Sequence, residues 1–343
     1  MLVHGCLEIL MPELRMDPLT GRLVSYAPER AKRPHEIGER APRLIDDKAS
    51  CPFCPGREEA LAPATLVLVK TGIGVKFERE DGDERKRDWI VKCVPNLYPA
   101  FSREDVLRKM DGVEAAPGRH EVLIDTPDHE GDPWALSVDQ LQYLLLAARE
   151  RVAQLEREPE IAYASFGKNQ GPYSGGSLRH PHSHILASSI TPPLLRVEAE
   201  KLLGESCVIC HYACDEISGP RAVLSTRNFA AICPWASREP YELLIFPKSH
   251  LRRFADLRDS ELLELSSMLS TIFKALRKVL GDQPSFNLIV HTKPKDVKDF
   301  HWHIEIVPRT LIPMVAEIGL EVHVNTMLPE KAAENLRQAV KEL

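Results

Sequence analysis

The feature that most constrains the fold of this chain is an internal repeat with a fixed offset of 121 residues. The offset relates His129 to His250, and it relates His180-Pro181-His182 to His301-Trp302-His303. Apolar residues around the histidines follow the same offset: Leu136, Leu141 and Leu144 map onto Leu257, Leu262 and Leu265. Self-similarity of this kind indicates a tandem duplication of one supersecondary unit. We therefore expect the 343 residues to form one module used twice, not two unrelated domains.

Each repeat also carries a CxxC pair, Cys51/Cys54 in the first and Cys207/Cys210 in the second. A two-residue spacer lets both thiolates reach one ion, because the chain turns between them. A redox-active dithiol is the alternative, but neither pair stands in a thioredoxin-like context, so two pairs favour zinc. With the repeated histidines, each half offers a Cys2His2 set with no open position, which is typical of structural zinc. The two sets are Cys51, Cys54, His129 and His180, and Cys207, Cys210, His250 and His301. Two weaker competitors lie beside the second pair: His211 and Cys214.

Hydrophobic periodicity predicts a mixture of strands and long helices. Helices are predicted at 137–156, where Ser137 and Gln140 form a capping-box pattern, and at 259–279 and 330–341. Strands are predicted at 23–26, 66–70, 74–77, 89–94, 161–166, 180–187, 286–291 and 301–307. This order predicts an α+β fold of tandem duplicated modules, each an antiparallel sheet with a long helix. We place a catalytic module at 1–195, a structural and substrate-binding module at 196–343, and a linker from 191 to about 205.

Composition and charge exclude several classes of partner. A net charge of −6 argues against a general nucleic-acid binder or a protein of anionic membrane surfaces. The chain contains no apolar run of transmembrane length. Residues 1–10 lack an early Lys or Arg and are interrupted by His4 and Glu8, so they make a poor signal peptide. We therefore expect a cytoplasmic protein whose cysteines are reduced thiols.

His180-Pro181-His182-Ser183-His184 is the sharpest catalytic signal. In an extended chain alternate side chains share one face, so the three imidazoles point the same way. If His180 binds zinc, the metal pins the strand and leaves His182 as a neutral imidazole, the form that can attack phosphorus. Directly upstream, residues 169–177 hold three glycines with amide and hydroxyl side chains, a composition suited to close approach of a phosphate.

The second repeat acts as an internal control for this assignment. Its corresponding segment, 292–300, contains no glycine, and Glu305 replaces His184. A carboxylate at that position would repel a phosphate. We infer that one half catalyses while the other has become structural, which favours His182 over His303 as the nucleophile.

Several motifs in this order resemble the galactose-1-phosphate uridylyltransferase family of the histidine-triad superfamily. They are residues 30–34, the Cys51/Cys54 pair, 95–99, 126–129, 169–177 and 180–182, and the likeness runs from about 12 to 343. The resemblance implies a homodimer and ping-pong chemistry, in which His182 holds a nucleoside monophosphate between a nucleotide sugar and a sugar 1-phosphate. It also implies that arginines near the N-terminus meet phosphates. The candidate substrate-binding residues are Arg30, Arg33, Asn96, Asn169, Gly175 and Ser177, and the candidate catalytic residues are His182 and His184.

Three departures from the family pattern bear on the reaction. His184 stands where transferases of the family usually have Gln, and a third histidine is usual in hydrolases of the superfamily. Leu97 replaces an acidic residue, and residues 321–329 look closer to the ADP-glucose phosphorylase-like branch. That branch also shares the second CxxC.

Relatives can instead hold a second metal, an iron, through residues that match Glu198, His291, His301 and His303. Because both schemes would use His301, we expect only one of them to operate, and the Cys207/Cys210 pair favours zinc.

The leading hypothesis is a UDP-glucose:galactose-1-phosphate uridylyltransferase of galactose metabolism. The branch features motivate adenylyl transfer from ADP-glucose or adenylyl sulfate to phosphate as the alternative. His184 motivates a third hypothesis, a nucleotide-conjugate hydrolase. A zinc-stabilised nucleotide-binding scaffold without catalysis is the non-enzymatic hypothesis, which the His182 segment disfavours.

Overall fold

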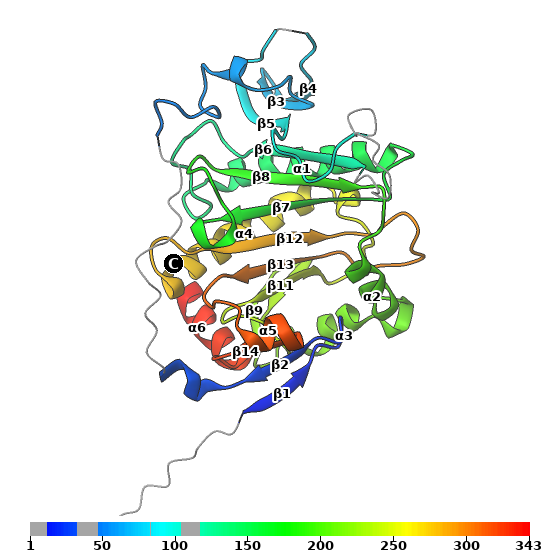
Figure 1. The fold of residues 1–343 in the computed structure, drawn as a ribbon, viewed down its shortest axis with the longest axis vertical. Coiled ribbons are helices and arrows are strands. Elements are labelled where there is room, and N and C mark those ends of the chain that lie inside the picture. The colour runs from blue at the N-terminus through cyan, green and yellow to red at the C-terminus, as the bar shows by residue number, and fades with distance from the viewer. Residues whose placement is uncertain (1–11, 33–46, 83, 104–116) are drawn as a thin grey trace, which may run out of the picture.

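A computed structural model describes residues 12–32, 47–82, 84–103 and 117–343. The candidate residue Arg33 lies outside these ranges. The described chain is built on an eleven-stranded sheet whose neighbouring strands are all antiparallel (Figure 1). None of the described helices combines the length and the apolar character needed to cross a bilayer.

The strand order of the large sheet repeats on either side of its centre. From the upper edge in Figure 1, the first half contributes β4 (Gly74–Glu78), β3 (Leu66–Thr71), β5 (Trp89–Pro95), β6 (Gly118–Ile124), β8 (His182–Ser188) and β7 (Tyr163–Gln170). The second half continues with β12 (Phe286–His291), β13 (His303–Pro308), β11 (Leu243–Pro247), β10 (Phe229–Ile232) and β9 (Ala222–Ser225). Strands β8 and β13 begin 121 residues apart, as the repeat predicts.

The two halves share one sheet, which differs from the expectation of a separate sheet in each half. Strands β7 and β12 pair directly, with Asn169 opposite Asn287. An edge strand leaves a row of unpaired backbone groups, and joining the two innermost edges satisfies both rows at once. The α+β class and the antiparallel pairing are confirmed.

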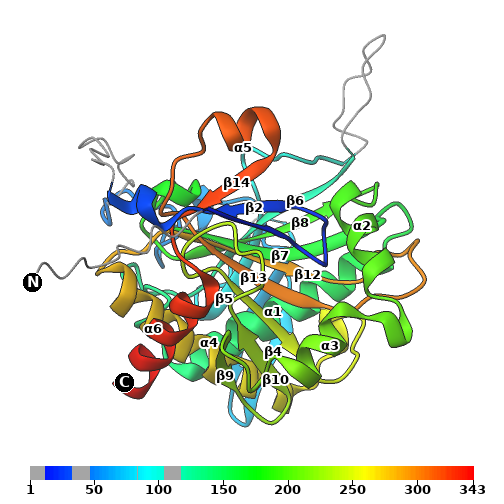
Figure 2. The same ribbon diagram turned by 90° about the horizontal axis from the view of Figure 1, so that it is seen from below.

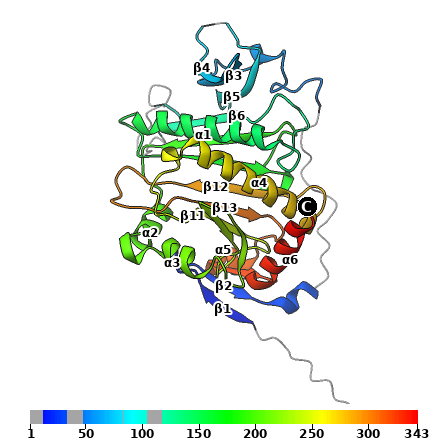
Figure 3. The ribbon, with the colours of Figure 1, turned by 180° about the vertical axis from the view of Figure 1, so that it is seen from behind.

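Helices cover one face of this sheet (Figure 3). They are α1 (Val138–Arg157), α4 (Asp259–Leu280) and α6 (Pro329–Lys341), close to the predicted ranges. The Ser137 hydroxyl accepts from the Gln140 backbone N–H at 3.1 Å, so the predicted N-cap forms. The Gln140 side chain does not complete a capping box, because its amide donates to the Asp125 carbonyl at 2.7 Å.

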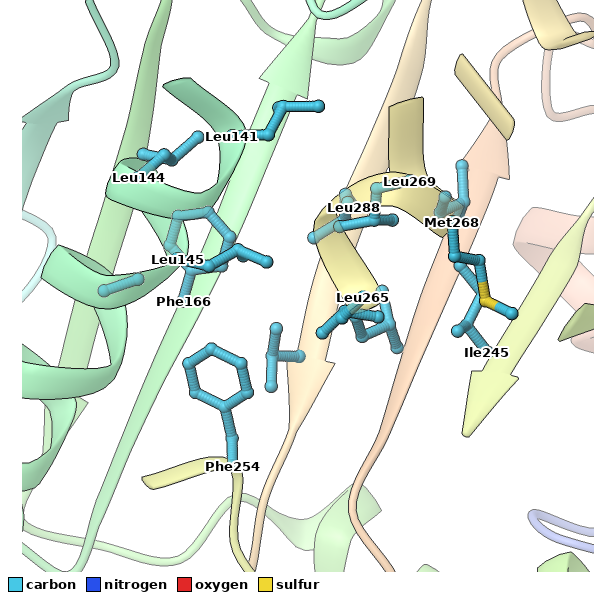
Figure 4. Close-up of a cluster of buried hydrophobic side chains, with 14 of the residues drawn as sticks. Leu141, Leu144, Leu145, Phe166, Ile245, Phe254, Leu265, Met268, Leu269 and Leu288 are labelled. Atoms are coloured by element: carbon cyan, nitrogen blue, oxygen red, sulfur yellow. The ribbon is translucent and has the colours of Figure 1, made fainter. Parts of the chain in front are cut away.

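The main hydrophobic core lies between these helices and the sheet and continues across both halves (Figure 4). It contains Leu141 and Leu145 of α1 with Phe166 of β7, and Leu265 of α4 with Leu288 of β12. Each such side chain contributes about 1.5–3 kcal/mol when fully buried. The shared core therefore couples the two repeats into one packed unit.

Residues 193–201 form a helix where the sequence had predicted a linker. This helix, α2 (Pro193–Lys201), begins with Pro193 in its first turn, a position where proline is favoured. Leu195 and Ala199, four residues apart, are buried in a second apolar cluster, and Glu198 is fully buried beside them. A short 3-10 turn, η5 (Gly204–Ser206), leads into α3 (Val208–Asp215).

A small second sheet joins the two ends of the chain (Figure 2). Strand β1 (Glu13–Met16) pairs antiparallel with β2 (Leu23–Tyr26), and β2 pairs parallel with β14 (Val322–Asn325). The N-terminal strands thus pack with C-terminal elements, and Tyr26 donates to the Ser237 carbonyl at 3.2 Å. The remaining short elements are α5 (Val315–Leu320), η1 (Pro28–Lys32), η2 (Glu58–Ala60), η4 (Pro172–Ser174) and η6 (Phe254–Asp256). The division at 195/196 stays a prediction.

Candidate active site and metal centres

His182 and His184 lie in β8, and their side chains are on the sheet face opposite α1. His182 lies opposite Ile124 of β6 and His184 opposite Val122, so both imidazoles share one face. The other face of β8 carries Ile185, which is buried in the main core beneath α1. The ring centroids of His182 and His184 are 5.4 Å apart. Because side chains alternate between the two faces of a strand, these two imidazoles lie next to each other and outside the main core.

His182 is oriented by its own backbone neighbour. Its Nδ1 lies 2.9 Å from the His180 carbonyl oxygen, so the Nδ1–H donates and the lone pair lies on Nε2. Burial, followed by the nearby Lys168 cation, lowers the pKa of His182. The side chain keeps 7% exposure, and the Phe53 ring lies 5.5 Å from it. His182 is thus a neutral imidazole with an available lone pair, which is the nucleophilic form.

A buried ion pair between Lys168 and Asp125 connects β7, β8 and the end of β6 next to His182. Lys168 of β7 lies 2.7 Å from Asp125 Oδ2, and its ammonium also donates to the His182 carbonyl at 2.9 Å. The two side chains are 5% and 1% exposed, respectively. Lys168 therefore ties the backbone of β8 to the end of β6. Their separation of 43 residues gives no sequence signal for this pair.

Replacing Lys168 with methionine is expected to lower the free energy of unfolding by about 3–5 kcal/mol, because it leaves Asp125 buried without its counter-ion. Urea unfolding followed by circular dichroism measures the loss. The matched control is the double variant Lys168→Met with Asp125→Asn, which removes both charges and should recover most of the stability. Equal losses in the single and double variants would contradict the ion-pair account.

His184 contacts His120, a residue outside the predicted site. His120 of β6 lies with Nε2 at 3.2 Å from His184 Nδ1 and at 3.1 Å from Asn96 Nδ2. Burial, with His182 and His120 contributing next, lowers the pKa of His184 to about 3. His120 and Asn96 also line a cavity of about 590 Å³, a volume typical of small-molecule sites. The 121-residue offset maps His120 onto Tyr241, so the repeat offers no hint of it.

The glycine-rich loop after β7 has a conformation that requires glycine. Gly171 has φ +81°, and a Cβ there would lie 2.4 Å from Ser285 Oγ. Gly175 is left-handed with φ +89°. Asn169 Oδ1 accepts from Asn287 Nδ2 at 2.7 Å, so the second half positions this predicted residue. Ser177 is exposed in the same loop.

The structure does not bring Arg30 into the histidine cluster. Arg30 lies on η1, where its Nη2 contacts Met314 Sδ at 3.5 Å beside α5. Figure 1 draws this turn on the side of the second half, away from β8. The phosphate contact that the resemblance implies for Arg30 stays a prediction.

The first Cys2His2 set converges beside His182. His180 Nδ1 lies 3.7 Å from Cys51 Sγ and 3.5 Å from Cys54 Sγ, and His129 Nδ1 lies 3.3 Å from Cys54 Sγ. The edge of a tetrahedral zinc site between nitrogen and sulfur is about 3.6 Å, so these distances fit. His180 Nε2 donates to the Thr126 carbonyl at 2.8 Å, which leaves Nδ1 as the ligand atom. Burial and the adjacent thiol raise the pKa of Cys54 to about 11, so a cation is needed to hold thiolates here.

The second set repeats this geometry. His301 Nδ1 lies 3.4 Å from Cys207 Sγ and 3.5 Å from Cys210 Sγ, and His250 Nδ1 lies 3.3 Å from Cys210 Sγ. Asp299 lies 3.2 Å from His250 Nε2, the carboxylate–histidine arrangement that orients metal ligands. All four donor atoms lie within 4.8 Å of one another, as they do in the first set. Both sets fit a tetrahedral metal.

A third cluster contains Glu198, His291 and His303. Glu198 lies 2.9 Å from His291 Nδ1 and 3.8 Å from His303 Nε2. His301 is not part of it, because its Nδ1 faces the cysteines of the second set. The expectation that only one of the two metals binds therefore stays a prediction, without a shared ligand to enforce it. The two ligand sets are separate.

In the second repeat, the segment that corresponds to residues 180–184 is buried. His303 corresponds to His182 and orients Nδ1 toward the His301 carbonyl at 3.0 Å, but its side chain is fully buried. The Phe300 ring lies parallel to it at 6.0 Å between centroids. Glu305, which replaces His184, pairs with Arg238 at 2.6 Å. The choice of His182 as the reactive copy stays a prediction.

Comparisons with known proteins cover nearly the whole chain. An ADP-glucose phosphorylase of Arabidopsis thaliana is 31% identical over 95% of this chain and 93% of its own length. A galactose-1-phosphate uridylyltransferase of Thermotoga maritima is 25% identical over 97% of this chain and all of its own. The crystal structure of an Arabidopsis thaliana ADP-glucose phosphorylase with bound ADP-glucose superposes with a TM-score of 0.77, at 27% identity, over 96% of this chain and 98% of that one.

Sequence-family models match the two halves separately. Residues 108–189 match the N-terminal domain of DUF4931, a domain of unknown function, and residues 206–310 match the scavenger mRNA decapping enzyme C-term binding family. A solved uridylyltransferase superposes with a TM-score of 0.71, at 27% identity, over 97% of this chain and 99% of that one.

Proposed function

Because the chain belongs to the galactose-1-phosphate uridylyltransferase family, in its ADP-glucose phosphorylase-like branch, we propose that His182 carries its nucleotidyl transfer. The protein is a nucleotidyltransferase acting between a nucleotide sugar and a sugar phosphate, a function that its ADP-glucose phosphorylase and uridylyltransferase relatives support. One observation supports His182 most directly. Its Nδ1–H is held by the His180 carbonyl, so the lone pair lies on Nε2.

The reaction follows in two steps from this geometry. His182 Nε2 attacks the α-phosphorus of the nucleotide sugar, and the bond from that phosphorus to the bridging oxygen breaks, so that a sugar 1-phosphate leaves. A phosphate oxygen of the acceptor then attacks the same phosphorus, and the electron pair of the P–N bond returns to His182. Splitting the transfer in this way lets one pocket serve both phosphate groups. Asn96, Asn169, Gly175 and Ser177 are the proposed contacts to nucleotide and phosphate.

The relatives favour an adenine nucleotide as the donor. The ADP-glucose phosphorylase is more similar in sequence than the uridylyltransferase, 31% against 25% identity, and its solved counterpart contains ADP-glucose. We therefore propose ADP-glucose as the donor and inorganic phosphate as the acceptor. Transfer between UDP-glucose and galactose 1-phosphate, the leading hypothesis from the sequence, is the second candidate.

Each Cys2His2 set is proposed to hold a structural zinc ion. The first set contains His180, whose carbonyl orients His182, and Phe53 between its two cysteines packs on the His182 ring. A zinc ion held by these residues would therefore fix the nucleophile from two sides and would play no part in the chemical steps. The third cluster at Glu198 is the proposed alternative site for iron.

We also propose a homodimer in the cytoplasm. Leu97 and Tyr98 are 80% and 84% exposed directly beside Asn96, and large apolar side chains of this exposure favour burial by a second copy. Four thiols reserved for metal ligation require a reducing compartment.

Steady-state kinetics with two donor–acceptor pairs test the proposed donor. We expect kcat/KM for ADP-glucose with phosphate to exceed that for UDP-glucose with galactose 1-phosphate about a hundredfold or more, because the wrong base leaves hydrogen-bonding groups unpaired. Each donor alone is the control for hydrolysis. A faster uridylyl pair would assign the chain to uridylyl transfer, and equal rates with and without acceptor would make it a hydrolase.

A further inference from the structure

His120 has no part in the two-step transfer described above, yet its ring lies against His184. The two ring centroids are 5.3 Å apart, and His120 Nε2 lies 3.2 Å from His184 Nδ1. The side chains belong to neighbouring strands, β6 and β8. The contact therefore reaches one of the two candidate catalytic residues from outside the histidine segment.

The backbone determines which nitrogen of His120 carries the proton. The Ala100 backbone N–H donates to His120 Nδ1 at 3.0 Å, so Nδ1 is an acceptor. Burial lowers the pKa of His120, which keeps the ring neutral. A neutral imidazole has one N–H and one lone pair, so the proton of His120 lies on Nε2.

Among the residues that the structure describes, one neighbour of Nε2 can accept that proton. Asn96 Oδ1 accepts from the Tyr98 backbone N–H at 2.8 Å, so the Asn96 atom 3.1 Å from His120 Nε2 is the NH2 group, which cannot accept this proton; with the proton on Nε2, that contact joins two donors and is not a hydrogen bond. The other neighbour is His184 Nδ1. The Nε2–H of His120 therefore donates to His184 Nδ1, and neutral His184 carries its own hydrogen on Nε2.

We propose that His120 is a positioning residue that holds His184 in the Nε2–H tautomer, so that the nucleotidyl-enzyme reacts with phosphate acceptors and not with water. The inference rests on the proposed function, because it concerns the fate of the intermediate on His182.

The chemical reason lies in the proton that water must lose. An anionic phosphate oxygen forms its bond to phosphorus and releases His182 without deprotonation, whereas attacking water needs a base. His184 has no lone pair to offer, because Nδ1 accepts from His120 and Nε2 already carries hydrogen. Burial lowers the pKa of His184 to about 3, so the ring stays neutral and offers only an N–H donor to the phosphoryl group. The amide of glutamine would offer the same donor.

The product ratio of the full-length enzyme tests the proposal. Nucleotidyl-enzyme is formed with ADP-glucose, or with UDP-glucose if that is the better donor, and challenged with inorganic phosphate in water. The nucleoside diphosphate reports phosphate attack and the monophosphate reports hydrolysis. His120→Glu replaces the N–H donor with a carboxylate that accepts from His184 Nδ1, which moves the His184 lone pair to Nε2. We expect the share of hydrolysis to rise about a hundredfold, the lower range for a positioned general base.

Two controls separate this effect from added charge or general damage. Leu186→Glu places a carboxylate at the exposed β8 position opposite His120 in the strand register and should leave the product ratio unchanged. His184→Gln removes the choice of tautomer, so adding His120→Glu to it should no longer shift the ratio. A shift that persists in the His184→Gln background, or no shift in the single variant, overturns the proposal.

The tautomer itself is measured without turnover. Long-range nitrogen–proton NMR of protein labelled at its 13 histidines, with the His184→Gln variant to assign the signal, should show His184 protonated at Nε2. A signal protonated at Nδ1 overturns the proposal whatever the reaction is. If neither donor forms an intermediate, the proposed function fails, while the NMR result still decides whether His120 sets the tautomer.

Discussion

Replacing His182 with glycine should reduce nucleotidyl transfer by about 10⁵–10⁶-fold, the scale of losing an enzyme's nucleophile. The variant lacks the imidazole whose Nε2 lone pair attacks phosphorus, the ring that the His180 carbonyl and Phe53 hold in place. Initial rates with the preferred donor and acceptor measure the loss, and thermal unfolding shows whether the fold persists.

His303→Gly is the matched control in the other repeat. His303 occupies the corresponding position but is fully buried beneath Phe300, so its removal is expected to lower stability and to leave formation of the covalent intermediate intact. Retention of turnover within about tenfold in the His182→Gly variant would show that another group is the nucleophile.

Loss of the first metal centre should have the largest effect on stability. Cys54→Ser removes a thiolate from the first set, and metal binding at such sites contributes on the order of 10 kcal/mol to folding. That figure is comparable with the whole stability of a typical domain, so the variant should melt far below the wild type or fail to fold. Activity should fall with it, because the set contains His180.

Metal analysis and thermal unfolding check this expectation. The wild type should contain two zinc ions per chain, one for each Cys2His2 set, and strong chelators should unfold it. Cys214→Ser is the matched control, since Cys214 is exposed and outside both sets, and it should change neither quantity. One zinc ion per chain in the wild type, or unchanged stability of Cys54→Ser, would contradict the two-site account.

The repeat made much of the fold predictable. The offset that links His129 to His250 also links the start of α1 to that of α4, and both long helices form close to their predicted bounds. The Cys2His2 sets could be predicted for the same reason, since paired cysteines and histidines recur in both halves. Because of the duplication, each long helix and each Cys2His2 set is indicated by the pattern in both halves of the sequence.

Pairings between distant segments could not be predicted in this way. The pairing of β7 with β12 depends on how the two halves pack together. The residue pattern of either strand does not indicate which strand it pairs with. Glu198 lay in a segment where the Pro192-Pro193 dipeptide indicated a linker, although Leu195 and Ala199 bury one face of a helix there. Tertiary packing decided both outcomes.

The sequence alone could not identify His120 and Lys168 as parts of the candidate site. Each is a single polar residue in a strand, with neither a motif nor a repeat partner of the same type. Their roles come from strand register, which places His120 against His184 and Lys168 against Asp125. Side-chain partners across a sheet become visible only when the strands are paired.

The attachment site of the nucleotide tests the central claim most directly. The full-length protein is mixed with ADP-glucose without acceptor, quenched, digested and analysed by tandem mass spectrometry, with UDP-glucose in a parallel reaction. The account predicts one nucleotidyl group per chain, attached to His182 and removed when phosphate is added before quenching. A nucleotidyl group on any other residue, or rapid turnover with acceptor but no covalent intermediate, would contradict it.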